Sequence, residues 1–372
     1  MSEFYIGVMS GTSLDGVDVV LCDIDNSKCR LISSSEYPFD AELKKDILHA
    51  INAPITLEFI GHLDTRLGEL YARTIATFIE EKNISVSEVR AIGLHGQTLW
   101  HQPNGDAPFS MQLGNPNVVT AKTGISVVCD FRRKDIANGG QGAPFAPAFH
   151  KEVFGLLGRK TAVVNIGGMA NITFLEGELR GFDTGVGNVL MDYWIQECKN
   201  LPYDKDGKFA ACGNINEELL NSFLSDDYFQ KLPPKSTGRE YFNATWLSTH
   251  MRGERMRGSA LGVPIFQTIS DEDIQRTLLE LTAKSIANEV LNTPTDLLIV
   301  CGGGAKNSFL MQRLQELCKI EIAKSDDYGV NSDFLEAMAF AWLAYKRVHN
   351  EKVQLSSVTG ALRDSVLGGV YL

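Results

Sequence analysis

The chain has 372 residues, of which 44% are apolar and 22% charged, and this balance excludes a disordered or fibrous protein and suits two globular domains. The formal net charge is -11 and no cluster of five or more Lys and Arg residues occurs, so the basic surface expected of a nucleic-acid-binding protein is missing. No apolar run approaches the ~18 residues of a membrane span.

The seven cysteines are far apart and form no C-x-x-C pair, so neither a disulfide framework nor a zinc site is indicated. The N-terminus lacks the basic and apolar regions of a signal peptide. We therefore expect reduced thiols in a cytoplasmic protein that is neither exported nor inserted in a membrane.

The N-terminal stretches "FYIGVMS" and "GVDVVLCDI" predict two strands of a hairpin, because both are apolar and β-branched. Their connection is more polar than a simple turn requires. It offers flexible backbone, hydroxyl donors and carboxylates, which suit bound phosphate and a hydrated cation. These residues are Gly11 and Gly16, Thr12 and Ser13, and Asp15 and Asp18. The alternative is a solvated hairpin tip.

A helix is predicted for "EFIGHLDTRLGELYARTIATFIEEKN", where apolar residues recur at helical spacing. The following "VRAIGLHGQT" predicts a strand that ends at a glycine turn. His95 in this turn is either a ligand contact or a satisfied polar residue at the strand end.

The stretch "CDFRRKDIANGGQGAPFAPAFH" is dense in Gly, Pro and Ala and predicts a loop that crosses near a cleft between two lobes. Arg132 and Arg133 in this loop are candidates for binding a substrate carboxylate, since a guanidinium group can bind one bidentately. A surface role is expected for one of the two.

The stretch "TAVVNIGGMANITFLEGELRGFD" repeats the pattern of strand, glycine turn and strand. Its turn "NIGGMAN", Asn165 to Asn171, could supply backbone donors to phosphate, or it could simply connect the strands. Asp183 in "GFDTGVGN" could act as a general base at the floor of a cleft, or form an Asx-turn.

A second helix followed by a strand and glycines is predicted from "DIQRTLLELTAKSIANEVL" and "TDLLIVCGGGAKN". The three glycines could hold a nucleotide base or ribose, or connect strand to helix with Asn307 or Ser308 as the cap. Between the second hairpin and this helix, "KLPPKSTGREYF" predicts an irregular segment.

Near the C-terminus, "DFLEAMAFAWLAYKRV" predicts a largely apolar helix, and "SVLGGVYL" predicts a short final strand. Glu336 would be costly to bury in this helix without a partner. It could instead belong to a capping box with Asp333 as the cap.

Each half of the chain thus offers a hairpin, a helix, a strand and a glycine turn, which predicts two duplicated α/β domains with a ligand cleft between them. The approximate boundaries are 1–135 plus 352–372 for the first domain and 136–351 for the second. The residues that define a P-loop or a Rossmann dinucleotide site are absent.

Eight motifs together resemble the anhydro-N-acetylmuramic acid kinase family, a branch of the superfamily of sugar kinases, actin and related chaperone ATPases. They run in family order over almost the whole chain: "MSGTSLDGVD", "GLHGQT", "QLGNP", "DFRRKDIANGGQGAP", "NIGGMANIT", "GFDTGVGN", "PPKSTGREYF" and "GGGAKN". The resemblance implies two actin-like (ribonuclease H-like) α/β domains, with ATP and Mg²⁺ held by the two hairpins.

The family's substrate is 1,6-anhydro-N-acetylmuramic acid, a product of peptidoglycan turnover. The implied reaction opens the anhydro ring with water and phosphorylates O6, giving N-acetylmuramic acid 6-phosphate and ADP. Asp183 matches the catalytic carboxylate, Asp15 would hold Mg²⁺ directly or through water, and His95, Gln97, Arg132 and Glu336 would lie near the sugar.

The resemblance also implies which residues bind ATP. They are Gly11, Thr12, Ser13, Leu14, Asp15, Gly16, Val17, Asp18, Asn165, Gly167, Gly168, Asn171, Gly302, Gly303, Gly304 and Asn307. The alternatives are a superfamily kinase for another sugar or small acid, and a nucleotide or sugar sensor without catalytic activity. Expected partners are therefore small molecules only, and the expected assembly is a homodimer, although no residue pattern fixes it.

Overall fold

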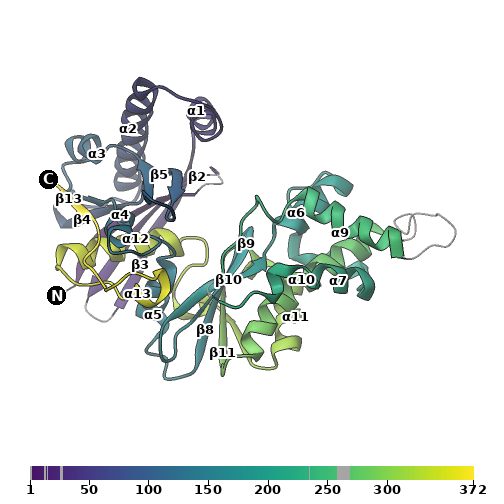
Figure 1. Cartoon of the computed structure of the whole chain (residues 1–372). Helices are drawn as coiled ribbons and strands as arrows, with labels where there is room; N and C mark the ends of the chain where they lie inside the picture. The colour runs from purple at the N-terminus through teal and green to yellow at the C-terminus, as the bar shows by residue number, and fades with distance from the viewer. Residues whose placement is uncertain (1, 12–13, 15, 26–27, 234, 258–268) are drawn as a thin grey trace. The chain divides into compact units, whose positions relative to one another are not determined.

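The computed structural model describes residues 2–372 except 12–13, 15, 26–27, 234 and 258–268. The chain forms two compact units (Figure 1). Unit 1 comprises Met1–Leu156 and Gly329–Leu372, and unit 2 comprises Leu157–Tyr328.

The division differs from the expected boundaries in two segments, 136–156 and 329–351, which lie in unit 1. The first contains the helix Ala146–Phe154, which packs against the strand Lys28–Pro38 and the helix Leu335–Val348 of unit 1. The second contains the helix Leu335–Val348 itself, which lies on the strands Glu3–Ser10, Gly16–Asp25 and Val89–Leu94. Long-range packing of this kind leaves no local mark in the sequence.

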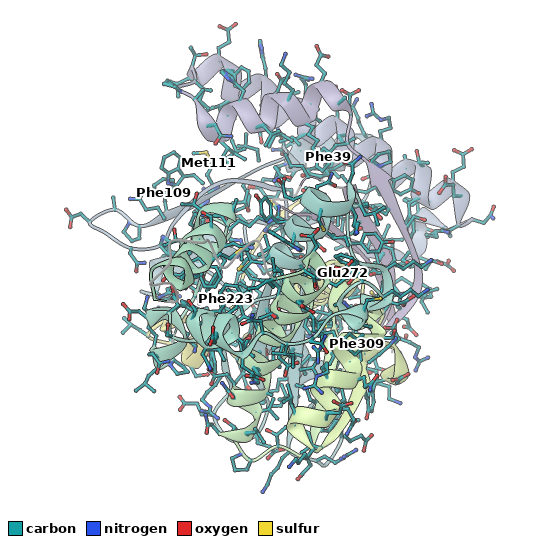
Figure 2. The ribbon with its side chains drawn as sticks, turned by 90° about the vertical axis from the view of Figure 1, so that its right-hand side faces the viewer. Phe39, Phe109, Met111, Phe223, Glu272 and Phe309 are labelled. Carbon is teal, nitrogen blue, oxygen red and sulfur yellow. The ribbon has the colours of Figure 1, made fainter. Side chains whose placement is uncertain are left out.

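The described residues of unit 1 form a mixed sheet in the order β13-β7-β4-β1-β2-β3. Strands β1, β2 and β3 are antiparallel neighbours, whereas β4 runs parallel to β1 and β7 parallel to β4. The strands of this sheet are β1 (Glu3–Ser10), β2 (Gly16–Asp25), β3 (Lys28–Pro38), β4 (Val89–Leu94), β7 (Val127–Cys129) and β13 (Gly369–Tyr371). A separate hairpin of β5 (Gln97–Gln102) and β6 (Phe109–Leu113) carries Phe109 and Met111, whose side chains are labelled in Figure 2.

The helices of unit 1 are α1 (Ala41–Asn52), α2 (Leu57–Glu81), α3 (Pro116–Thr123), α4 (Arg132–Ala137), α5 (Ala146–Phe154), α12 (Leu335–Val348) and α13 (Ser356–Thr359). The long helix α2 buries Leu63, Leu67, Leu70, Ile75 and Phe78, which recur at helical spacing. Thr56 caps its start by accepting a hydrogen bond from the Phe59 N–H. The predicted helix is therefore confirmed.

Unit 2 contains a mixed sheet in the order β10-β9-β8-β11-β12. Its strands are β8 (Thr161–Ile166), β9 (Met169–Phe174), β10 (Arg180–Val186), β11 (Leu297–Cys301) and β12 (Glu321–Lys324). Its helices are α6 (Val189–Lys199), α7 (Glu217–Leu224), α8 (Asp227–Gln230), α9 (Ala244–Arg257), α10 (Asp271–Leu291) and α11 (Ser308–Cys318). Phe223 on α7 belongs to the apolar core, and Phe309 on α11 packs against that core (both labelled in Figure 2).

The two sheets share one topology. In each, a three-stranded antiparallel meander (β1-β2-β3 or β8-β9-β10) is extended by two parallel strands beside its first strand (β4-β7 or β11-β12). This order is that of the ribonuclease H-like, actin-like fold, so the predicted duplication of an α/β unit is confirmed.

Two glycines allow α12 to lie directly on the sheet of unit 1. A Cβ atom at Gly7 of β1 would collide with the carbonyl oxygen of Ala337, and one at Gly93 of β4 with that of Phe340. The close approach fixes the height of α12 above β1 and β4, and it thereby positions Glu336 in the first turn of α12.

The stretch predicted as a crossing loop contains two helices, α4 and α5, so that prediction is wrong in part. Both helices are short, with six and nine residues. Proline lies in the first turn of α5, where its missing N–H costs no hydrogen bond. The "KLPPKSTGREYF" segment is irregular as predicted, within its described residues.

The described residues contain no helix with the combined length and apolarity needed to cross a membrane. All seven cysteines are among the described residues, and all seven are free thiols.

Candidate active site

The turn between β1 and β2 is anchored in the core of unit 1 by Leu14. Its side chain is only 1% exposed, and its backbone takes the left-handed conformation, with φ of 57°. The Leu14 N–H donates to the Gly11 carbonyl at 3.2 Å. Leu14 and the buried Val17 therefore shape the turn, and their side chains are not available to a ligand. Thr12, Ser13 and Asp15 lie outside the described residues.

Negative charge gathers at the start of β2. Asp18 is half-buried and lies opposite Glu36 of β3, whose carboxylate also lies against Gly16. The pKa of Asp18 is raised to about 7, mainly by burial and in addition by the charges of Glu36, Glu336 and Asp333. A cation bound here would relieve this repulsion.

His95 and Arg132 form a pair at the end of β4. The His95 Nε2 accepts hydrogen bonds from Arg132 Nη2 at 2.9 Å and from Nε at 3.3 Å. Burial and the neighbouring guanidinium hold the pKa of His95 well below its usual range, so the ring is neutral. The ring also packs against Phe340 of α12, with centroids 4.7 Å apart.

Arg132 is fixed by further contacts. Its Nη1 donates to the Gly142 carbonyl at 2.8 Å, and the guanidinium lies 5.1 Å from the centroid of the Phe145 ring. Burial lowers the pKa of Arg132 to about 10, while the charge of Glu336 opposes this shift. Arg132 therefore remains a cation at neutral pH and is held in one orientation. Arg133, the second arginine of the pair, is exposed and pairs with Asp130 at 3.1 Å.

Gln97 and Glu336 are the remaining predicted site residues of unit 1. Gln97 is fully buried and donates from Nε2 to the Gly11 carbonyl at 3.4 Å, which connects β5 to the hairpin turn. Glu336 is exposed on the first turn of α12, whose N-cap position is Phe334 without a side-chain cap. The structure thus contradicts a capping box with Asp333 as the cap.

The turn between β8 and β9 is braced by the segment that follows β10. The amides of Gly187 and Val189 donate to the Gly168 carbonyl at 2.9 and 3.1 Å, and the Asn188 amide donates to Gly167 at 2.8 Å. The space beside Gly168 faces the Arg239 guanidinium, 3.5 Å from where a Cβ would lie. The turn is therefore rigid, with a cation beside it.

Polar side chains form a row across the sheet of unit 2. Asp183 of β10 lies opposite Asn171 of β9, which lies opposite Asn165 of β8. Directly opposite residues on neighbouring strands point to the same face of a sheet. Each of the three is half-buried. The row places Asp183 beside Asn171 and Asn165, the two residues that bound the "NIGGMAN" turn.

Asp183 lies within β10, so it does not form an Asx-turn. Its Oδ2 accepts a hydrogen bond from the Thr237 N–H at 2.9 Å, and its own N–H donates to the Lys235 carbonyl at 3.0 Å. The Tyr228 hydroxyl donates to the Asp183 carbonyl at 2.8 Å. These contacts fix the backbone at Asp183 and engage its Oδ2 atom. None of these three hydrogen bonds involves Oδ1, the other carboxylate oxygen.

The pKa of Asp183 is raised to about 6, mainly by burial. The Thr237 N–H opposes the shift and the charge of Glu240 adds to it. A carboxylate in this state is ionised at neutral pH yet more basic than an exposed one, as general bases require. Sequence reasoning missed Tyr228, Thr237 and Glu240; the last two stand in the "PPKSTGREYF" motif, which was the available signal.

Unit 2 also contains a cavity of about 460 Å³. Its lining includes Gly303 and Asn307, two of the residues expected to contact the nucleotide, together with Asn188, Asp192, Tyr203 and Lys306. Asn307 also caps α11 by accepting a hydrogen bond from the Leu310 N–H, so the predicted capping role of this residue is confirmed. The volume lies within the usual range for small-molecule sites, and Asn188, Tyr203 and Lys306 were missed by sequence reasoning.

Gly302 and Gly304 shape the turn after β11. A Cβ at Gly302 would collide with Asn165 Oδ1, and one at Gly304 with the Ile166 side chain. Gly302 has φ of 76° and ψ of -178°, a conformation that is essentially restricted to glycine. A Cβ atom added at the neighbouring Gly303 would lie 3.5 Å from Asn188 Nδ2, which is an ordinary van der Waals contact.

We expect Gly302→Ala to weaken nucleotide binding at least tenfold, because backbone strain of about 1–3 kcal/mol and a clash with Asn165 would displace the turn. The control variant Gly61→Ala on α2, where no atom lies within 4 Å of the added methyl group, should bind ATP within about threefold of the parent. Calorimetric titration with a non-hydrolysable ATP analogue measures both. Equal affinities in the two variants would contradict the assignment of this turn to the nucleotide.

The chain matches the family model for anhydro-N-acetylmuramic acid kinase over residues 3–372. It is 58% identical to the anhydro-N-acetylmuramic acid kinase of Sulfurimonas denitrificans over the full length of both chains. The Sulfurovum sp. enzyme of the same name is 53% identical, with 100% of this chain and 99% of the relative covered. For the Vibrio vulnificus enzyme the identity is 48%, with 99% and 98% covered.

Among solved structures, component A of the (R)-2-hydroxyglutaryl-CoA dehydratase of Acidaminococcus fermentans has a TM-score of 0.47 at 12% identity, covering 93% of this chain and 99% of its own. The ROK family glucokinase of Streptomyces griseus, solved with glucose and AMPPNP, has a TM-score of 0.40 at 13% identity, with 92% and 99% covered. The whole-length family match and the three relatives are decisive: this chain belongs to the anhydro-N-acetylmuramic acid kinase family.

Proposed function

We propose that the protein is an ATP-dependent kinase that opens the 1,6-anhydro ring of 1,6-anhydro-N-acetylmuramic acid with water and phosphorylates O6. The products are N-acetylmuramic acid 6-phosphate and ADP, and the reaction belongs to the recycling of cell-wall peptidoglycan. Family membership supports the substrate. The observation that carries the mechanism is Asp183, a half-buried carboxylate with a raised pKa, held by the Thr237 N–H.

In the proposed reaction, Asp183 takes a proton from water as the water oxygen attacks the anomeric carbon. The bond between that carbon and O6 breaks, O6 attacks the γ-phosphorus, and the bond from phosphorus to the bridging oxygen of ADP breaks. One base thus serves both bond changes. The nearby carboxylate also favours positive charge at the anomeric carbon, as in glycoside hydrolysis.

The nucleotide would be held by the backbone of the two hairpin turns and by the cavity of unit 2. The rigid turn at Gly167 and Gly168, with Arg239 beside it, suits phosphate, and the cavity of about 460 Å³ at Gly303 suits the nucleoside. Backbone donors of this kind cost no reorganisation during phosphoryl transfer.

Magnesium is the cofactor expected with ATP, and the charges at the start of β2 fit a hydrated dication. Asp18 lies among carboxylates that raise its pKa, and oxygen ligands with several waters are what Mg²⁺ prefers. Asp15 remains the proposed ligand, directly or through water, although it lies outside the described residues. Bound Mg²⁺ would neutralise charge on the phosphates.

On the sugar side, Arg132 is the proposed partner of the substrate carboxylate. Its orientation is fixed by His95, Gly142 and Phe145, so little side-chain entropy would be lost on binding. His95 then acts by positioning Arg132. Glu336, exposed on α12, is proposed to accept hydrogen bonds from the sugar, and Gln97 to hold the hairpin turn.

The experiment that tests the function is turnover of the anhydro sugar with ATP in ¹⁸O-labelled water. We expect one label at the anomeric position and an unlabelled phosphate on O6, because ring opening is hydrolytic. A kinase for another sugar would transfer phosphate without consuming an anhydro bond, and a sensor would bind without turnover. Absence of label from the anomeric carbon would refute the proposed ring opening.

The activity is expected to fall with a slope of one below pH ~6, because Asp183 must be ionised and burial raises its pKa to about 6. Removing the nearby charge with Glu240→Gln should lower the pKa of Asp183 and move this acidic limb down by a few tenths of a pH unit. Profiles of kcat/KM between pH 5 and 8 measure the shift.

A second carboxylate could produce the same fall of kcat/KM at acidic pH. Burial also raises the pKa of Asp192, in the nucleotide cavity, to about 6. We therefore expect the limb to persist in Asp192→Asn at saturating ATP. Its disappearance in that variant, with the Glu240→Gln profile unshifted, would assign the limb to Asp192.

A cytoplasmic location is also proposed, since all seven thiols are free and ATP is the cosubstrate. The homodimer likewise stays a proposal, which sedimentation equilibrium would test.

A further inference from the structure

A second cavity lies in unit 1, between α4, the C-terminal end of α12 and the final segment of the chain. Its volume is about 720 Å³, and its lining includes none of the residues that the proposed function assigns to ATP or sugar; Arg133, a candidate from the sequence alone, pairs here with Asp130. The lining is rich in cations although the chain carries a net charge of -11. The cationic residues are Arg133, Lys134, Arg347, Lys352 and Arg363.

The carboxylates of this cavity are already engaged. Asp130 pairs with Arg133 at 3.1 Å. Asp364 accepts hydrogen bonds from the amides of Leu355 and Ser356 at 3.0 and 2.9 Å. These hydrogen bonds, which outweigh the opposing effect of burial, and the charge of Lys352 hold the pKa of Asp364 below its usual value. Five cationic side chains and two carboxylates therefore leave an excess of positive charge in the lining.

Three cations remain available to a ligand. Lys134, Lys352 and Arg363 are exposed, and in the described part of the chain none of them forms a salt bridge. Arg363 is oriented by a long hydrogen bond from its Nε to Asn138 Oδ1, at 3.4 Å. Arg347 is directed toward the backbone, since its Nε donates to the Gly368 carbonyl at 2.8 Å.

The walls of the cavity are held together independently of any ligand. Asp135 of α4 accepts from the Thr359 hydroxyl at 2.9 Å, and the Asn138 side chain donates to Ser365 Oγ at 2.8 Å. The Leu362 amide donates to the Asn138 carbonyl at 2.8 Å. Lys134 and Arg363 thus stand on segments with a fixed separation, and a bound anion would not need to order the backbone.

We propose that this cavity binds a small molecule carrying a doubly charged phosphate group. Two lysine ammonium groups and one guanidinium match the charge and the oxygen acceptors of phosphate. The volume lies in the range of small-ligand sites and would admit inorganic phosphate, pyrophosphate or a sugar phosphate. The strongly acidic chain disfavours long polyanions, so the ligand is small.

The test is calorimetric titration of the full chain with inorganic phosphate, pyrophosphate and a hexose 6-phosphate, with a non-hydrolysable ATP analogue present at saturation. The triple variant Lys134→Ala, Lys352→Ala and Arg363→Ala should bind the preferred anion at least tenfold more weakly than the parent. A control variant, Lys45→Ala, Lys82→Ala and Arg90→Ala, removes the same charges from exposed positions of unit 1 and should bind like the parent.

The three anions distinguish free phosphate from a phosphate ester as the source, since an ester site should favour the hexose 6-phosphate. Turnover of the triple variant without added anion is expected to equal that of the parent, which shows that the fold is intact. Equal weakening in the triple and control variants would overturn the proposal, because only the net charge would then matter. Absence of binding to the parent would overturn it as well.

Discussion

Asp183→Asn is expected to reduce kcat about 10³-fold while the affinity for ATP stays within about threefold of the parent, because it removes the proposed general base and leaves the nucleotide contacts in place. The amide oxygen of Asn can still accept the hydrogen bond from the Thr237 N–H, so the local backbone is preserved. Single-turnover kinetics and calorimetry with an ATP analogue measure the two quantities.

The stability of this variant can be predicted from the pKa of the carboxyl group. Burial raises the pKa of Asp183 to about 6 in the folded chain, above its ordinary value of 3.8. Its stabilising contribution is therefore complete below pH ~3.8 and lost as the pH rises through about 6. At pH 7.5 the ionised group opposes folding, so Asp183→Asn should be at least as stable as the parent there.

Glu240→Gln is the control for Asp183→Asn, since it removes a neighbouring carboxylate that acts on Asp183 only through its charge. Its kcat at pH 8 should remain within about threefold of the parent, because Asp183 is ionised in both proteins. If Asp183→Asn is folded, binds ATP and turns over at a near-normal rate, the proposed base is wrong.

The elements predicted from local sequence were those with strong periodicity. The hairpins of β1-β2 and β8-β9 follow from β-branched apolar runs around glycine turns, and α2, α10 and α12 follow from helical spacing of apolar residues. The order of these elements was enough to predict the duplicated topology. The short helices α4 and α5 were not predicted, because helices of six and nine residues carry little periodic signal and the stretch around them is rich in Gly and Pro.

The candidate residues that sequence reasoning missed are those brought in by long-range contacts. Thr237 donates to Asp183 from a segment that the sequence showed only to be irregular. Tyr203 and Lys306 meet in the cavity of unit 2 that is proposed for the nucleotide, although they lie on either side of α10 in the chain. Polarity and glycine content indicate that a turn is a candidate binding site, but they do not predict which distant segment of the chain will pack beside it.

Gly7→Ala is expected to destabilise unit 1 by about 3 kcal/mol or more, which is at the upper end for overpacking a core. The added methyl group would collide with the Ala337 carbonyl and lie 2.9 Å from the Ala341 amide, both of which are backbone atoms of α12. A flexible side chain could rotate away, whereas here the whole helix must move. Gly93→Ala meets the Phe340 carbonyl in the same way and should have a similar effect.

Urea unfolding followed by tryptophan fluorescence measures the loss, and the transition of unit 1 should shift to lower urea. The matched control is Gly61→Ala on α2, where no atom lies within 4 Å of the added methyl group. That change should stabilise the protein by about 0.5–1 kcal/mol, since alanine favours a helix over glycine. Because displaced α12 would carry Glu336 with it, Gly7→Ala should also raise the KM for the sugar more than that for ATP. Equal stability of Gly7→Ala and Gly61→Ala would show that α12 is not held against β1 as closely as the structure places it.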